Sequence, residues 1–125
     1  MQEPADTDDK AIEVIVEDYF LGMYEADTER LQRIFHPQCW LFGENPRGSH
    51  AFPVKGFIEQ IGSSPAPKVE GEPYDMHLVS VDRTGPVAVA KVNVRYQNRH
   101  FTDYLVMQRT GDEWRIVNKA FFSPD

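Results

Sequence analysis

The side chain with the clearest chemical potential in this sequence is an aspartate inside an apolar run. Asp103 lies between Phe101 and Leu105, and alternate residues of a strand point to the same face of a sheet. A carboxylate in an apolar wall is costly unless it is neutral or hydrogen-bonded, because the charged form loses its hydration. We therefore expect Asp103 to have polar partners and to lie where a ligand could reach it.

Three other polar side chains are candidate partners of Asp103. Tyr19 lies on the apolar face of an expected helix, and a buried phenol needs a hydrogen-bond partner of its own. His77 and Asn118 lie on expected neighbouring strands. In one interpretation Tyr19 and Asp103 stabilise a ligand oxygen while His77 moves a proton, which would make these three residues catalytic. In the other, the same side chains only satisfy buried polar groups.

The protonation of Asp103 separates two arrangements. Beside a phenol in an apolar cavity, a neutral acid could donate a hydrogen bond to a ligand oxygen. If the last hairpin instead has a three-residue loop, Lys119 lies directly opposite Asp103 and holds it as an ionised carboxylate. The sequence favours the neutral acid, and both arrangements stay open.

Other kinds of site have less support in the sequence. Cys39 is the only cysteine, which excludes an intrachain disulfide and a thiolate zinc cluster, and we expect it to be a small buried hydrophobe. His36 precedes Pro37 at an expected helix end, where a capping role is predicted. The chain has no His-x-His pair, glycine-rich phosphate loop or serine elbow. We therefore predict no metal and no cofactor.

The first half of the sequence predicts the helices that would position these side chains. Apolar residues recur at spacings of three and four over residues 9–26, which predicts an amphipathic helix. A second, short helix is expected over residues 28–36 and a third around residues 57–61. Residues 1–8 are acidic and poor in apolar side chains, so we expect a disordered tail there and a single domain over residues 9–125.

The last part of the sequence predicts strands separated by short polar turns. The strands are expected at residues 75–82, 87–97, 100–108 and 114–122, with a shorter one at 39–42 and turns at 84–85, 98–99 and 111–112. If each turn is a two-residue hairpin loop, Val92 and Asn118 both oppose Leu105, and His77 opposes Val92. This register places most of the apolar side chains on one face of the sheet, and residues 43–52 are expected to form a surface loop.

Helices followed by a meandering antiparallel sheet predict an α+β fold in which the helices cover the apolar face. A curved sheet wrapped in this way leaves a mostly apolar cavity at its open end. The residues expected to line it are Tyr19, Phe20, Met23, Phe35, His36, Cys39, Val94, Tyr96, Phe101, Asp103, Leu105 and Asn118.

Several segments of the chain resemble a known family. IFHPQCWLFG, VAVAKVNVRYQ and, most specifically, FTDYL and the W-x-I-V-N-K-x-F pattern near the end are similar to the family of putative lumazine-binding proteins, over roughly residues 10–122. That family belongs to the nuclear transport factor 2-like superfamily. The resemblance implies a cone-shaped fold, with a curved antiparallel sheet covered by about three helices, and a small-molecule ligand that is lumazine-like or another small aromatic compound. It also implies a homodimer formed through the outer face of the sheet.

A more distant likeness to ketosteroid isomerase, another member of that superfamily, suggests a second function. EDYFLGM and FTDYLVM resemble the segments that hold its oxyanion-binding tyrosine and protonated aspartate. The match places these roles on Tyr19 and Asp103, and it places the general base on Gly43, which cannot fill that role. Glu44 could replace the base only if the loop register shifts. The alternative to a binding domain is therefore a cofactor-independent isomerase, cyclase or dehydratase with a Tyr/Asp oxyanion site.

Charge and hydropathy limit the partners. With 13 basic and 20 acidic residues the chain carries a formal net charge of −7, which argues against general nucleic-acid binding. No apolar run approaches the ~20 residues of a membrane span. The acidic beginning of the sequence differs from a signal or transit peptide, so a cytoplasmic location is expected.

The outer face of the expected sheet mixes apolar and basic side chains. Its apolar members are expected to be Tyr104, Val106, Val117 and Phe121, and its basic members Lys91, Arg95, Arg115 and Lys119. Such a face is too apolar for a solvated surface and too polar for a core, which favours a self-complementary homodimer interface. A protein-interaction domain without a ligand is a third possible function, because one fold serves many ends.

Overall fold

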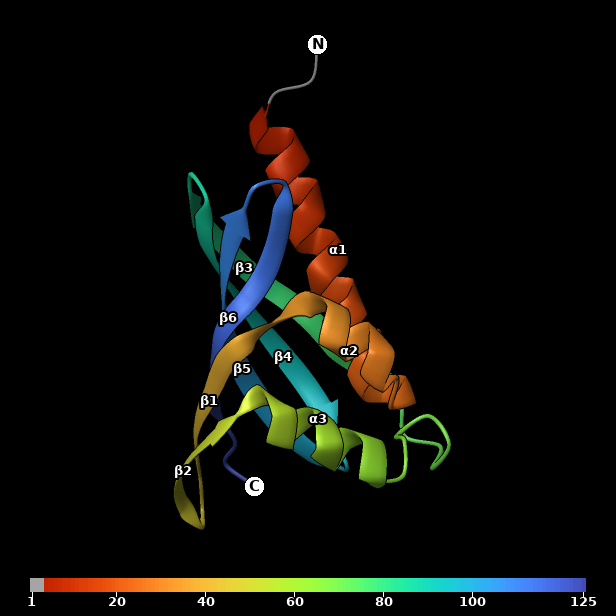
Figure 1. Ribbon diagram of the computed structural model, residues 1–125. Helices are drawn as coiled ribbons and strands as arrows, with labels where there is room; N and C mark the ends of the chain where they lie inside the picture. The colour runs from red at the N-terminus through yellow and green to blue at the C-terminus, as the bar shows by residue number, and fades with distance from the viewer. Residues whose placement is uncertain (1–3) are drawn as a thin grey trace.

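The computed structural model describes residues 4–125 as helices and strands in the order expected of the predicted α+β class (Figure 1). The elements are α1 (Pro4–Glu25), α2 (Thr28–Ile34), β1 (Phe35–Asn45), β2 (Gly48–Pro53), α3 (Val54–Ser63), β3 (Met76–Thr84), β4 (Val87–Tyr96), β5 (Arg99–Thr110) and β6 (Glu113–Phe122). The helices lie on one side of the sheet (Figure 1). The predicted fold class is therefore confirmed.

Helix α1 begins earlier than predicted. Of the expected tail over residues 1–8, residues 1–3 lie outside the described residues, but the helix already includes Pro4. Proline is well tolerated at the first helical position, where its missing N–H would have no partner in any case. Asp8, only 7% exposed, is buried against distant strands, so the prediction of a disordered segment is wrong for residues 4–8.

The six strands form one curved sheet in the order β2-β1-β6-β5-β4-β3. Every neighbouring pair is antiparallel except β1 and β6, which run parallel. The sheet is therefore mixed, whereas the sequence predicted an antiparallel one. The predicted surface loop over residues 43–52 is also wrong, because this segment forms the end of β1, a tight turn and most of β2. Gly48 at that turn has φ +120°, a conformation that favours glycine.

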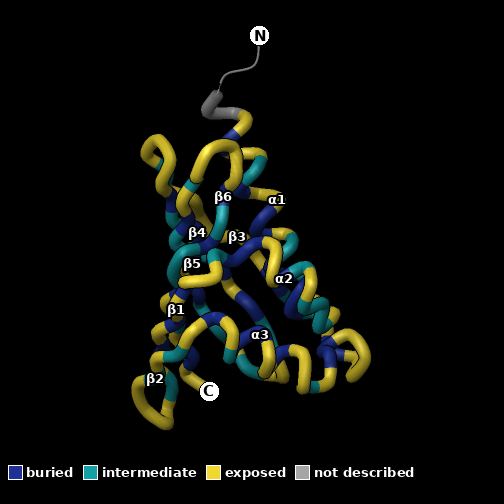
Figure 2. Tube along the Cα trace, in the orientation of Figure 1, coloured by how far each residue is buried: buried dark blue, intermediate teal, exposed yellow. Residues whose placement is uncertain are grey.

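The molecule tapers from one end to the other. Near its N-terminal end α1 lies close to the sheet, and toward its C-terminal end the two diverge and α2 and α3 fill the gap (Figure 1). We call these the narrow end and the wide end of the cone. The buried residues lie between the helices and the sheet (Figure 2). Those completely shielded from solvent include Ile12, Tyr19, Leu31, Leu41, Ala90, Val92, Leu105, Met107 and Ile116.

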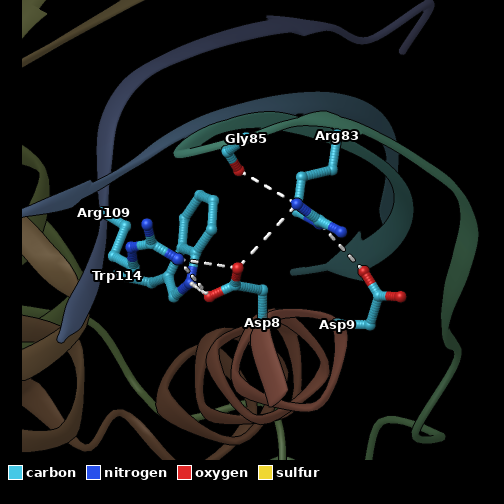
Figure 3. A network of polar contacts seen from close by, with 6 residues as sticks. All are labelled: Asp8, Asp9, Arg83, Gly85, Arg109 and Trp114. Carbon is cyan, nitrogen blue, oxygen red and sulfur yellow. Dashed lines mark hydrogen bonds and ion pairs between the residues drawn. The ribbon is translucent and has the colours of Figure 1, made fainter. Parts of the chain in front are cut away.

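Asp8 joins the start of α1 to three strands at the narrow end (Figure 3). Its carboxylate accepts hydrogen bonds from Trp114 Nε1 at 3.0 Å and from Arg109 Nη1 at 2.7 and 2.8 Å. Arg83 lies 3.8 Å from Asp8 and also pairs with Asp9 at 3.1 Å. The hydrogen bond from Trp114, followed by that from Arg109, holds the pKa of Asp8 below its usual range. This network fixes the narrow end.

The hairpin between β4 and β5 turns one residue earlier than predicted. Gln97 and Asn98 occupy the turn with φ values of +53° and +60°, the left-handed pair typical of a type I′ hairpin. As a result Asp103 pairs with Val92, and Leu105 pairs with Ala90. The register differs from the prediction by two positions, so every side chain keeps its predicted face.

A bulge in β6 changes the face of several side chains. The turn at residues 111–112 is as predicted and Met107 pairs with Ile116, but the next pair is Val106 with Asn118, which leaves Val117 unpaired. One extra residue reverses the alternation beyond it. Lys119 therefore points into the cone and Asn118 points out, the reverse of the prediction.

A second bulge has the same effect in β3. Close to the β3–β4 turn Val81 pairs with Ala90, but beyond the bulge at Val79 the pairs are Leu78 with Val92 and His77 with Asn93. The prediction that His77 faces Val92 and the interior is wrong.

Candidate functional site

A cavity of about 230 Å³ opens at the wide end of the cone. It lies between α3, the β1–β2 hairpin and the inner face of the sheet at the β4–β5 turn. The lining residues are Met23, Leu41, Asn45, Arg47, His50, Phe52, Phe57, Gln60, Ile61, Tyr96, Arg99, Phe101, Asp103, Lys119 and Phe121.

The polar floor of this cavity consists of Asp103 and Lys119, with Tyr19 beneath them. The Tyr19 hydroxyl donates a hydrogen bond of 2.6 Å to Asp103 Oδ2. Lys119 Nζ lies 3.7 Å from the same oxygen, which is an ion-pair distance but longer than a hydrogen bond. Asp103 is 1% and Lys119 4% exposed. The arrangement that pairs Asp103 with Lys119 is thus the one found, although a bulge produces it and not a longer loop.

Lys119 lies among aromatic rings. Its Nζ is 4.2 Å from the centroid of the Phe57 ring, 5.2 Å from that of Tyr19 and 5.4 Å from that of Phe121. The faces of aromatic rings attract a cation, but they stabilise its charge far less than the water molecules that surround an exposed ammonium. Burial lowers the pKa of Lys119 below its usual value, and the nearby carboxylate of Asp103 only partly opposes this effect.

The second carboxylate oxygen of Asp103 has no partner among the described residues. Asp103 Oδ1 is buried and forms no hydrogen bond. A buried acceptor without a donor costs roughly 1–3 kcal/mol. Tyr19 cannot relieve this cost, because its one hydroxyl proton is already donated to Oδ2. Burial raises the pKa of the phenol well above its usual value, so the hydroxyl keeps that proton. An oxygen acceptor and an ammonium therefore lie side by side at the floor of the cavity.

Aromatic side chains form the walls. The ring of Phe121 lies 6.3 Å from that of Phe52 and 6.2 Å from that of Phe101, in tilted and edge-on arrangements. Phe57 closes the wall on the side of α3, where its ring lies 5.8 Å from that of Phe35. Walls of this kind suit a flat apolar ring system.

The rim of the cavity carries positive charge. Arg47 in the β1–β2 turn and Arg99 at the start of β5 both line it. His50 on β2 also lines it, with Nε2 at 3.1 Å from Asn45 Oδ1. With Lys119 at the floor, the site combines three cationic side chains with a single carboxylate, an excess that favours ligands with anionic or carbonyl oxygens.

The position matched to a general base is filled by an aromatic ring. A Cβ at Gly43 would overlap the ring of Phe121, its partner across β1 and β6. Glu44, the predicted replacement, is exposed and accepts a hydrogen bond from Ser49 Oγ. Neither position supplies a carboxylate to the cavity.

The predicted pocket residues fall into three groups. Met23, Tyr96, Phe101 and Asp103 line the cavity. Those buried in the core without lining it are Tyr19, Phe20, Phe35, Cys39, Val94 and Leu105. Burial raises the pKa of the Cys39 thiol to about 11, as expected for a core cysteine.

The remaining predicted residues lie away from the cavity. His36 Nδ1 accepts a hydrogen bond from the Gln38 N–H at 3.0 Å, on the outside of β1. Asn118 donates to the Trp40 carbonyl at 3.1 Å. His77 is 67% exposed and lies 2.7 Å from Asp75. The prediction that these three face the pocket is wrong; for His77 and Asn118 the reason is the bulges described above.

The favoured register placed the residue that most changes the chemistry of the site on the wrong face of the sheet, and only the alternative with a three-residue loop set Lys119 against Asp103. Lys119 was predicted on the outer face, together with Phe121, because no local signal marks the bulge at Val117. The hairpin residues Arg47, His50 and Phe52 were missed because their segment was predicted as a loop.

A wider groove of about 840 Å³ runs along α2 and α3 on the outside of the molecule, but its polar members, such as Arg33 and Glu59, are exposed surface side chains. Within the residues that the structure describes, no group of three or more His, Cys, Asp or Glu side chains could hold a metal ion. No helix in the same part of the chain is long and apolar enough to cross a membrane.

Comparison with known proteins identifies the family of the chain. The sequence model of the family described as "putative lumazine-binding" matches residues 7–122. No curated protein matches the chain by sequence.

Solved structures show the same fold. An NTF2-like protein of unknown function from Shewanella baltica superposes with a TM-score of 0.86 at 20% identity, over 100% of this chain and 99% of that one. One from Silicibacter pomeroyi gives 0.82 at 21% identity, over 97% and 99%. A cystatin-like fold protein from Burkholderia xenovorans gives 0.68 at 13% identity, over 98% and 94%. At these identities the likeness shows the fold alone.

Proposed function

The chain belongs to the putative lumazine-binding family of NTF2-like proteins, and from this premise we propose that it binds a small, flat aromatic compound carrying carbonyl or anionic oxygens. The binding site is the cavity at the wide end. The observation that carries the proposal is a buried ammonium, that of Lys119, close to Oδ2 of a carboxylate whose other oxygen, Asp103 Oδ1, has no partner among the described residues, beneath aromatic walls.

The floor of the cavity matches a particular pattern of ligand atoms. Lys119 can donate to a carbonyl or anionic oxygen, and Asp103 Oδ1 can accept from an adjacent N–H. An imide or amide edge presents these groups side by side. Lumazine is a pteridinedione with such an edge on a flat bicyclic ring, so its shape and polarity suit both floor and walls. The name of the family and the geometry thus support the same class of ligand.

The alternative function, a cofactor-independent isomerase, cyclase or dehydratase, draws less support from this geometry. It requires a Tyr19–Asp103 oxyanion site and a base facing it. Tyr19 is completely buried with its hydroxyl bonded to Asp103, and none of the proposed bases (His77, His36 and Glu44) lines the cavity. The binding function is therefore the one that we carry forward.

Calorimetric titration of the full chain with lumazine tests the proposal. Lys119→Met should weaken binding roughly 10- to 100-fold, because a hydrogen bond to a charged group contributes about 1.5–3 kcal/mol. Lys68→Met is the matched control, since Lys68 is 61% exposed and does not line the cavity, and it should leave the affinity unchanged. Binding that is equally tight in both variants, or absent from the wild type for lumazine and for simpler aromatic acids, would refute the proposed site.

We also propose that two copies associate through the outer face of the sheet. The exposed aromatic residues of β1, β5 and β6 are Trp40, Phe42, Tyr104 and Phe122, each between 43% and 53% exposed. Phe42 and Tyr104 flank Ala120 in the strand pairing, and this small residue keeps the centre of the face flat. Sedimentation at micromolar concentrations should show a dimer that Phe42→Asp dissociates. A monomeric wild type would contradict this assembly.

A further inference from the structure

Lys119 differs from the other described lysines in both burial and surroundings. It is 4% exposed and faces a cavity, whereas Lys10, Lys55 and Lys68 are exposed and Lys91 is half-buried on the sheet. Its Nζ lies within 3.7 Å of one acceptor and against three aromatic rings. Such an amine is poorly solvated and within reach of any ligand that fills the cavity.

We infer that Lys119 forms an imine with an aromatic aldehyde or ketone that enters the cavity. The inference rests on the proposed binding function, and it names a reactive class among the ligands. An amine reacts with a carbonyl carbon only in its unprotonated form, so burial, which lowers the pKa of Lys119, favours the reaction.

Asp103 can carry the protons that this reaction requires. From its resting distance of 3.7 Å the ammonium moves into hydrogen-bond contact with the carboxylate and transfers a proton to it, which leaves a free amine and a carboxylic acid. The nitrogen lone pair attacks the carbonyl carbon, the C–O π pair moves to oxygen, and one proton passes from nitrogen to oxygen to give a neutral carbinolamine. The remaining lone pair on nitrogen then expels the hydroxyl group, which leaves as water with the proton from Asp103.

The product restores the original charges. It is a protonated imine beside an ionised carboxylate, in place of an ammonium beside the same carboxylate. The buried site therefore gains no net charge, and Asp103 compensates the iminium as it compensates the ammonium. The unpartnered Oδ1 of Asp103 provides the second oxygen at which a proton can be held during the exchange.

Reductive trapping tests this inference. The full chain is incubated with 4-formylbenzoate and sodium cyanoborohydride at neutral pH, and peptide mapping by mass spectrometry locates the reduced adduct. The probe combines an aldehyde, a ring that fits the aromatic walls and a carboxylate for Arg47 or Arg99 at the rim. We expect Lys119 to be labelled at least about tenfold faster than any other lysine, because the cavity holds the aldehyde beside the amine.

Two controls complete the experiment. Lys119→Arg should remove the fast labelling and Lys68→Arg should retain it; the map of the wild type decides the question even if the first variant folds poorly. The alcohol 4-(hydroxymethyl)benzoate, which cannot form an imine, should bind and slow the labelling of Lys119. Labelling confined to the exposed lysines, or no labelling at all, overturns the inference. If the alcohol still binds in that case, the proposed binding function survives.

Discussion

The two ends of the cone each bury a carboxylate, and they treat it differently. At the narrow end, both oxygens of Asp8 accept hydrogen bonds and two arginines surround it. At the wide end, Asp103 has one bonded oxygen, one unpartnered oxygen and an ammonium just beyond hydrogen-bond distance. A saturated network stabilises architecture, whereas an unsaturated one beside a cavity leaves donors and acceptors for a ligand. The narrow end therefore stabilises the fold, and the wide end is the part that we propose to bind the ligand.

The largest effect is expected at the narrow end. Trp114→Ala removes a side chain that is 6% exposed and should lower the free energy of unfolding by about 3–5 kcal/mol. Trp114→Phe keeps an aromatic ring but loses the hydrogen bond to Asp8, so it should cost less than the alanine variant and more than nothing. Urea denaturation measures both. A loss below about 1 kcal/mol for the alanine variant would show that Trp114 does not anchor this end.

A comparable loss of stability is expected at the wide end, where a second substitution should restore it. Asp103→Ala leaves Lys119 buried without a counter-charge and should cost about 3–5 kcal/mol at neutral pH. The double variant Asp103→Leu with Lys119→Met should recover most of this stability, because neither charge then has to be buried. The same urea denaturation applies. If the double variant is no more stable than Asp103→Ala, the Asp103–Lys119 pair stabilises the fold, as the Asp8 network does, and the contrast between the two ends is wrong.

A smaller effect is expected where β1 passes Phe121. Gly43→Ala places a methyl group against the Phe121 ring and should destabilise the fold by about 1–3 kcal/mol. Gly56→Ala is the matched control: nothing lies within 4 Å of a Cβ there, and the change should stabilise α3 by up to about 1 kcal/mol. Equal effects of the two changes would show that the wall of the cavity is not closely packed.

The smallest effect is one of pH. Because the folded-state pKa of Asp8 is lowered, its contribution to stability is present above the unfolded value of 3.8 and is lost as the pH falls through the folded value. Asp8→Asn should therefore flatten the fall of stability at acidic pH. Asp9→Asn serves as control, since Asp9 is 58% exposed, and it should retain the fall. Thermal unfolding between pH 2 and pH 6 distinguishes them; identical acid profiles for Asp8→Asn and wild type would contradict the role of the network.

The fold could be predicted from the sequence because its signals are local. Apolar spacing marked α1, and alternation with short turns marked β3 to β6. The parallel pairing of β1 and β6 and the hairpin of β1 and β2 depend on contacts between distant segments, which the turn-rich residues 43–52 do not reveal. Asp8 was missed for the same reason, because its partners lie on strands that are far away in the sequence.

The site was predicted only in part because its register depends on bulges. Tyr19 and Asp103 were predicted as a pair, since each needed a polar partner on the apolar side, and they do form a hydrogen bond. Val79 and Val117 look like ordinary strand residues, yet each is a bulge that reverses the faces beyond it. Because of these two single-residue shifts, His77 and Asn118 point out of the cone and Lys119 points into it, contrary to the favoured prediction.

The most direct test of the proposed binding site is to map the residues that a bound ligand contacts. In backbone amide NMR spectra of the full chain titrated with lumazine, we predict that chemical-shift changes concentrate at Phe52, Gln60, Phe101 and Phe121, around the cavity. The indole N–H of Trp114, which donates to Asp8 at the narrow end, should not move. Changes that centre on that indole or on the outer groove at Arg33, or a spectrum that does not change at all, would contradict the claim that the wide end is the binding site.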